Sequence, residues 1–234
     1  MSRILRGGLI AFLFLGFVAS ASASDLTGMA GVGIRLGGCW FTSGLDPDRT
    51  STDKYGNPVD IPQSVSPRLS GDLVASYVWS DNITIEAATG WSWSAITAGD
   101  DALQDSFYVA TSVPFIIGAR YNMRHGKTWR PFIGAGGGGY WVSVLTRDLG
   151  PAKDPVTYED LRKFVPGVYG TVGVERPVTK LVTATGDAAY HYAFWEDKEK
   201  FPSGFNGDKA YFQLRLAMIF HFSVSERIET GFPE

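Results

Sequence analysis

The residues best suited to chemistry lie near the end of the chain. His221 and Ser223 are spaced to share one face of a strand, and Glu226 follows them closely. A serine deprotonated by a histidine, which a carboxylate orients, is the arrangement of a nucleophilic hydrolase. Nothing in the spacing assures that the carboxylate meets the other two side chains. Hydrolysis is therefore a minor alternative, and we expect no enzyme and no catalytic residue.

A second pair, Asp187 and His191, is also spaced to share a strand face. These side chains could exchange a proton, but buried polar groups are usually satisfied by ordinary hydrogen bonds. We therefore expect a structural role for both residues.

Metal-ligating residues are few. The chain has three histidines and a single cysteine, Cys39, so no tight zinc pattern can be drawn and no internal disulfide can form. Four acidic residues gather in one loop, but the glycine and closing glutamate of an EF-hand are missing. They are Asp46, Asp48, Asp53 and Asp60. We predict no metal and no cofactor.

Strands must position all of these residues, because apolar and polar side chains alternate along most of the chain. The clearest case is 211–222, where Leu214, Leu216 and Met218 oppose Gln213 and Arg215. The alternation predicts eight strands, near 30–40, 69–79, 83–93, 107–121, 129–145, 168–175, 182–194 and 211–222. The glycine run 134–139 leaves the facing of the fifth strand open and allows a bulge there.

Short and long connections alternate along the predicted strands. The short ones lie near 80–82, 123–128 and 177–179, and the long ones near 42–68, 95–106, 146–164 and 195–209. An up-and-down sheet places alternate connections at opposite ends, and outer-membrane barrels have short periplasmic turns and longer external loops. In the third long connection, Thr157 and Asp160 form a capping pattern that predicts one helical turn over 157–163.

One face of the predicted sheet carries charge, which decides which side points inward. Its members are Arg35, Asp72, Glu86, Arg120, Glu175, Asp187, His191 and Arg215. Unpaired buried charge would destabilise a soluble sandwich or a lipocalin-like barrel, whereas a membrane barrel is polar inside and apolar outside. We predict an all-β, eight-stranded antiparallel up-and-down transmembrane barrel. Its lumen would hold these eight residues as a structural charge network.

Aromatic residues near the strand ends favour the same interpretation, because aromatic rings gather at membrane interfaces. They are Trp40, Phe41, Trp79, Trp91, Trp93, Trp129, Trp141, Tyr192 and Phe194.

The N-terminus has the pattern of an export signal. Arg3 and Arg6 precede a short apolar stretch and the small residues 19–23. We predict a cleaved signal peptide at 1–23, a barrel at 24–222 and a C-terminal tail at 223–234. The formal net charge of −3 argues against a nucleic-acid partner, which a basic surface would bind.

Two segments carry a family resemblance. Val113–Asn122, a short turn and then Arg130–Gly136 resemble small outer-membrane barrels of the OmpW and OmpA-like porin-family type. The resemblance covers the chain from about Met29 to Phe222. It implies the outer membrane of a Gram-negative cell envelope, contact with outer-membrane lipid and lipopolysaccharide, and insertion by the barrel-assembly machinery.

Function is less constrained than fold. Eight strands leave an interior about filled by side chains, so we expect a structural barrel, or one that passes small apolar molecules. The alternatives are a surface adhesin whose long loops bind a ligand and, less favoured, a lipid A hydrolase built on His221 and Ser223.

Overall fold

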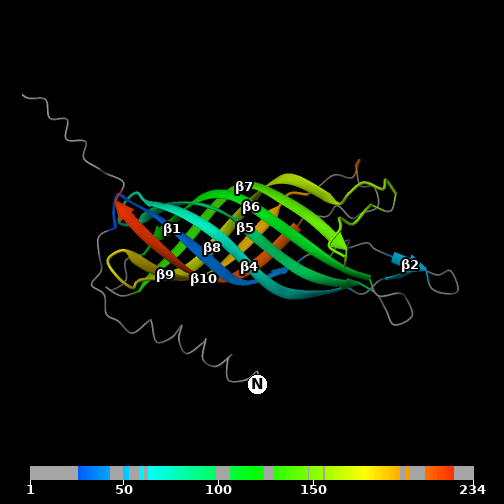
Figure 1. The fold of residues 1–234 in the computed structure, drawn as a ribbon, viewed down its shortest axis with the longest axis horizontal. Coiled ribbons are helices and arrows are strands. Elements are labelled where there is room, and N and C mark those ends of the chain that lie inside the picture. The colour runs from blue at the N-terminus through cyan, green and yellow to red at the C-terminus, as the bar shows by residue number, and fades with distance from the viewer. Residues whose placement is uncertain are drawn as a thin grey trace, which may run out of the picture.

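The chain forms a closed antiparallel barrel in a computed structural model (Figure 1). The structure describes residues 26–42, 50–52, 58–60, 63–98, 106–123, 129–146, 148–154, 156–195, 199–200 and 209–223. The expected signal peptide at 1–23 lies outside the described residues, as does the tail beyond Ser223.

Eight long strands make up the barrel. They are β1 (Met29–Phe41), β4 (Gln63–Val78), β5 (Ile83–Ala98), β6 (Ser106–Asn122), β7 (Arg130–Thr146), β8 (Arg162–Pro177), β9 (Val182–Ala193) and β10 (Lys209–Ser223). Around the barrel they follow the order β1-β10-β9-β8-β7-β6-β5-β4, and β1 pairs with both β10 and β4. The predicted eight-stranded up-and-down barrel is confirmed.

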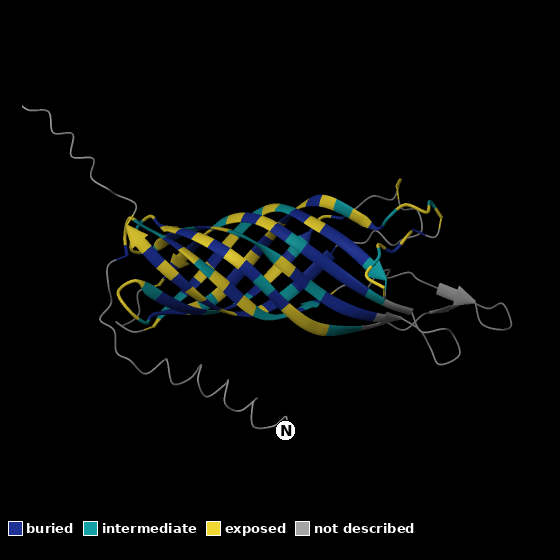
Figure 2. Cartoon of the chain, in the orientation of Figure 1, coloured by how far each residue is buried: buried dark blue, intermediate teal, exposed yellow. Residues whose placement is uncertain are grey.

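The strands form where side chains alternate, and the alternation becomes two surfaces. Exposed and buried residues form a chequered pattern over the barrel wall (Figure 2). In β10, Leu214 and Leu216 are exposed while Gln213 and Arg215 are buried. Because successive side chains of a strand point to opposite faces, the apolar set covers the outside and the polar set lines the lumen.

The connections differ from the prediction in detail. The first long connection carries a small hairpin of β2 (Thr50–Thr52) and β3 (Pro58–Asp60). β4, β5 and β8 extend further toward the long loops than expected, since backbone pairing continues where the alternation of side chains has ended. Met29 and Ser223 are direct partners, so both ends of the barrel chain lie at the end with the short turns.

The side chains of the glycine-rich strand β7 alternate between the lumen and the outer surface. On β7, Phe132, Tyr140 and Val142 are buried in the lumen, while Ile133 and Trp141 are exposed. The pairing of β7 with β6 and β8 is unbroken, so the glycine run contains no bulge. The register shift in the barrel wall lies instead in β4.

Glycines on the lumen side make room for large aromatic residues. A Cβ at Gly136 would lie 2.7 Å from the ring of Tyr169, and one at Gly118 would lie 2.4 Å from its hydroxyl oxygen. A Cβ at Gly167 would lie 2.7 Å from the ring of Tyr140. The small residues therefore allow a narrow barrel to hold bulky side chains inside.

The third long connection contains a turn where we predicted helix. The carboxylate of Asp154 accepts hydrogen bonds from the backbone N–H groups of Val156 and Thr157, both at 2.9 Å. Residues from Arg162 onward already belong to β8. The predicted helical turn at 157–163 is therefore wrong, because pairing with β7 outweighs the local capping pattern. Among the described residues, no helix is long and apolar enough to span a membrane.

Candidate functional site in the barrel lumen

Each of the eight barrel strands contributes one charged side chain to the ion pairs of the lumen. In order around the barrel these are Arg35 (β1), Arg215 (β10), Asp187 (β9), Glu175 (β8), Arg130 (β7), Arg120 (β6), Glu86 (β5) and Asp72 (β4). We call this set the charged belt. It holds four arginines and four carboxylates, so its formal charges balance.

Five belt residues form a continuous chain of ion pairs. Glu86 contacts Arg35 at 2.5 Å and Arg120 at 3.2 Å. Glu175 contacts Arg120 at 2.6 Å and Arg130 at 3.7 Å. The ring of Phe132 also lies 4.9 Å below the guanidinium carbon of Arg120. With three arginines and two carboxylates, this group has a formal charge of +1.

The other three belt residues form a second group around Arg215. Its guanidinium contacts Asp72 at 2.9 Å and pairs with Asp187 through two nitrogens. Arg215 also donates to Gln213 at 3.0 Å, and Thr171 donates to Asp187 at 2.9 Å. This group has a formal charge of −1 and offsets the first.

Almost all of the belt is removed from solvent. Apart from Arg130, the side chains of the ion-paired belt residues are at most 6% exposed. A buried charge is strongly destabilising without a partner. Arginine suits such a site because its planar fork can donate to two carboxylates at once.

Several of these contacts join strands that are separated by one intervening strand. Arg35 lies on β1 and Glu86 on β5, and these strands are not neighbours. The same holds for Arg120 on β6 with Glu175 on β8. The belt therefore ties together strands that share no backbone hydrogen bonds.

An aromatic layer lies next to the belt, on its long-loop side. The ring of His191 stacks between Tyr169 and Tyr211, with centroid distances of 5.4 and 4.6 Å. Tyr140 meets His191 edge-on, and its hydroxyl lies 3.2 Å from Nδ1. The hydroxyl of Tyr211 reaches Ser112 at 3.5 Å, on the strand directly opposite in the barrel.

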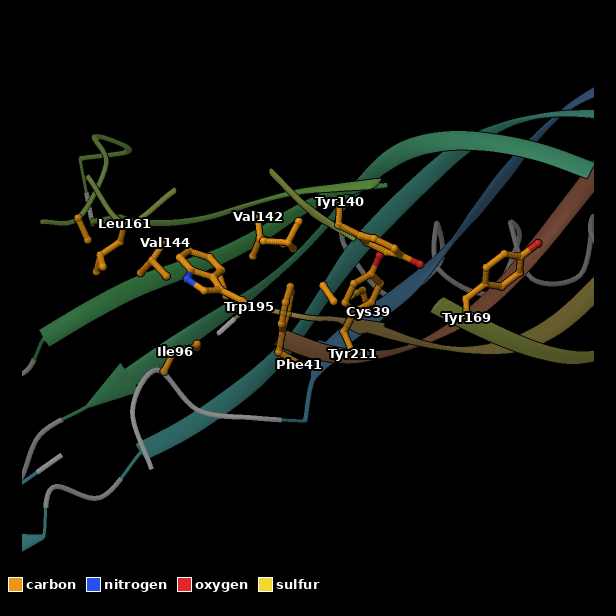
Figure 3. Packing of buried hydrophobic residues seen from close by; sticks show 14 of the residues in the cluster. Cys39, Phe41, Ile96, Tyr140, Val142, Val144, Leu161, Tyr169, Trp195 and Tyr211 are labelled. Carbon is orange, nitrogen blue, oxygen red and sulfur yellow. The ribbon is translucent and has the colours of Figure 1, made fainter. Parts of the chain in front are cut away.

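Apolar side chains form a third layer toward the long loops (Figure 3). Phe41, Val142 and Trp195 are at most 2% exposed and pack in one cluster with Ile96 and Val144. Phe41 thus lies in the lumen, and its expected place among the interface aromatics is wrong. Ala152 and Leu161, from the third long connection, pair with β7 through backbone hydrogen bonds to Val144 and cover this layer.

The predicted site residues fall into two layers. Seven of the eight lie in the charged belt, and His191 lies in the aromatic layer. Asp187 is bonded to Arg215 and Thr171, so it does not act as a partner of His191. Sequence reasoning missed Arg130, the fourth arginine. The alternation of Phe132, Tyr140 and Val142 on β7 was the signal that could have placed it in the lumen.

The hydrolase residues do not form a triad among the described residues. Nε2 of His221 lies 3.1 Å from the hydroxyl of Thr183, and the ring is buried. Ser223 ends β10 and is exposed, while Glu226 lies outside the described residues. Within the described part of the chain, no three His, Cys, Asp or Glu side chains gather as metal ligands. Asp46, Asp48 and Asp53 lie outside that part.

The outer surface decides the environment of the barrel. Large apolar side chains are exposed on every barrel strand, among them Val32, Leu73, Trp91, Ile117, Ile133, Val172, Tyr190 and Leu216. An apolar surface of this extent is unfavourable in water. A closed sheet in which every strand is paired is one of the two structures that can span a lipid bilayer. This is an outer-membrane β-barrel protein. In barrels of this kind the short turns face the periplasm and the long loops face outward.

Known proteins resemble this outer-membrane barrel in fold. No family model matches the sequence, and no curated protein does. Neisserial surface protein A is 14% identical, with 84% of this chain and 98% of that chain covered and a TM-score of 0.48. OprG of Pseudomonas aeruginosa is 13% identical, with 86% and 99% covered and a TM-score of 0.48. Outer membrane protein W of Escherichia coli is 16% identical, with 84% and 98% covered and a TM-score of 0.39.

Proposed function

We propose that this protein is a structural barrel whose lumen is closed to hydrated solutes and whose long loops form an outer surface. The observation that carries the proposal is the set of side-chain contacts that fill the lumen. Ion pairs join non-neighbouring strands, and Tyr211 reaches the opposite wall at Ser112. An open porin instead needs a water-filled channel and more strands. Passage would be limited to small apolar molecules that avoid the belt.

Planar-bilayer recordings of the refolded barrel test the closure. We expect the native protein to give only small or flickering currents. Replacing Glu86 by alanine removes the carboxylate shared by Arg35 and Arg120, so conductance should rise. Replacing the exposed Glu159 by alanine is the matched control and should leave the current unchanged. Large, steady currents from single native barrels would refute the proposal.

The arrangement of the third loop favours surface binding as a second candidate. Asp154 is fully buried and holds the turn of this loop through two backbone N–H groups. Lys200 of the fourth long connection pairs with Glu159 at 3.1 Å, which joins the two loops. Ordered loops on a rigid barrel are suited to recognition. Replacing residues 156–159 with a glycine-serine linker should abolish any binding of the loop to a cell surface or to lipopolysaccharide while leaving the barrel folded.

We propose that this barrel has no enzymatic activity. The support for this proposal is that the ring of His221 is buried and its Nε2 lies 3.1 Å from the hydroxyl of Thr183. The test is the mass of lipid A from cells that express the barrel. An unchanged mass is expected, and a shift that disappears in Ser223→Ala would establish the hydrolase instead.

A further inference from the structure

A β-bulge in β4 turns an arginine to the outer surface of the barrel. The register between β4 and β5 shifts between Pro67 and Ser70. The two residues inside the shift, Arg68 and Leu69, therefore oppose the single residue Trp93 of β5. In regular alternation Arg68 would point into the lumen with Ser70, but both Arg68 and Leu69 are exposed. Bulges are known to redirect a side chain in this way.

Trp93 supports the guanidinium group of Arg68 and leaves most of its donors free. The guanidinium carbon lies 5.8 Å from the centroid of the Trp93 ring. Trp93 in turn stacks on Trp91, with ring centroids 5.6 Å apart and an angle of 15° between the planes. Of the five N–H donors of an arginine, Nη1 of Arg68 donates to the carbonyl oxygen of Pro67 at 3.3 Å. Within the described ranges Arg68 forms no ion pair, so its other donors are available to an anion outside the protein.

Arg68 lies at the outer edge of the lipid-facing band. β4 leads from the long loops to a short turn, where Trp79 is 66% exposed and meets Tyr77 edge-on. Aromatic pairs of this kind are typical of a membrane interface. The chain from Arg68 to Trp79 spans roughly 36 Å along the strand, which at a tilt of about 40° is about 28 Å along the barrel axis. Because the apolar band of such barrels is about 25 Å tall, Arg68 lies at the level of the headgroups on the long-loop side.

The surface beside Arg68 is open, and further aromatic rings lie beyond it. Gly38 of β1 pairs with Leu69. A Cβ at Gly38 would meet only the backbone oxygen of Arg68, at 4.0 Å, so no described side chain covers this position. Next on the same face of β1, Trp40 packs against Phe212 of β10, with ring centroids 4.6 Å apart. A headgroup at Arg68 would thus lie between two pairs of aromatic rings.

We propose that Arg68 binds a phosphate group of lipid A in the outer leaflet of the membrane. The charge of the guanidinium complements the phosphate, and its planar fork can donate two parallel hydrogen bonds to it. Lipid A is the phosphorylated lipid of the outer leaflet, which is the leaflet on the long-loop side. The inference rests on the barrel spanning the outer membrane with its long loops outward. It depends neither on closure of the lumen nor on binding by the third loop.

Native mass spectrometry of the refolded barrel tests the inference. In dodecyl maltoside micelles the barrel is mixed with bisphosphorylated lipid A, with the same lipid A after removal of both phosphates, or with dipalmitoyl phosphatidylglycerol. The lipid molecules retained per barrel are then counted. Arg68→Gln removes the charge of an exposed side chain. Arg162→Gln is the matched control, because Arg162 is also exposed at the long-loop end of a strand but pairs with Asp160 at 3.1 Å.

We expect one retained lipid A on the native barrel and on Arg162→Gln. Arg68→Gln should weaken retention about tenfold, the effect of one hydrogen bond to a charged group. Arg68→Lys should recover part of it, because the charge returns without the planar fork. The barrel with the glycine-serine linker at 156–159 should retain lipid A like the native barrel, which separates this site from the third loop. The gel shift on boiling verifies folding of every variant.

Three results would overturn the inference. Equal retention by Arg68→Gln and Arg162→Gln would show that Arg68 is not the site. Equal retention of the dephosphorylated lipid A by the native barrel would show that the phosphate is not recognised, and this comparison needs no variant. Equal retention of phosphatidylglycerol would show that the site does not select lipid A.

Discussion

Replacing Arg215 by leucine is expected to destabilise the barrel more than any single change on its surface. The arginine side chain is 2% exposed and serves Asp72 and Asp187 at once. Leucine would leave both buried carboxylates without their cation. Breaking a buried ion pair by removing one partner costs about 3–5 kcal/mol. We expect a loss in this range in the free energy of unfolding.

Reversible urea unfolding in lipid vesicles measures this loss, with Arg162→Leu as the control. Arg162 pairs with Asp160 at 3.1 Å, but its side chain is 54% exposed, so its loss should cost less than about 1 kcal/mol. A triple variant that adds Asp72→Asn and Asp187→Asn removes the uncompensated charge. It should recover most of the stability, because neutral replacement of a buried ionic group is often tolerated.

Two results would refute this reasoning. The first is a loss below about 1 kcal/mol for Arg215→Leu, which would mean that water or relaxation solvates the carboxylates. The second is no recovery in the triple variant, which would assign the loss to the missing volume of the arginine instead of its charge.

Three further changes probe the wall and the layers. Leu216→Arg places a charge on the lipid face and should destabilise by about 2–4 kcal/mol in the same assay; an unchanged free energy would contradict the outward facing of this residue. Gly136→Ala should cost about 1–3 kcal/mol, because its Cβ would lie 2.3 Å from a backbone oxygen and 2.7 Å from the ring of Tyr169. Gly170→Ala, in open space, should be neutral, and equal effects would show that the lumen is not tightly packed. Tyr140→Phe removes the hydrogen bond to the buried histidine and should cost about 1 kcal/mol, with no rise in conductance.

The sequence predicts the barrel well because its signal is repeated on every strand. Alternation on β10 assigns Arg215 to the lumen and Leu216 to lipid, and in the structure Arg215 is buried and Leu216 is exposed. Where glycines replace side chains, as in the centre of β7, the alternation is interrupted, and Arg130 was missed although Phe132 and Tyr140 on either side of the run share its facing. The ion-pair partners within the belt could not be predicted from the sequence either. Arg35 lies opposite Asp72 on the neighbouring strand but forms its ion pair with Glu86. The side of the barrel wall on which a side chain lies depends on the order of residues along its own strand. Its ion-pair partner depends on how closure of the barrel brings strands together that are distant in the sequence.

The charged belt also bears on how the barrel assembles. A slip of one residue in the pairing of a strand turns every side chain to the opposite face. For β10, such a slip would move Arg215 into lipid and Leu216 into the belt. It would also leave Asp72 and Asp187 without their arginine at the moment the first and last strands meet. A one-residue slip of β10 would therefore separate these charges, so the ion pairs of the belt favour the native register over this slip when the first and last strands meet.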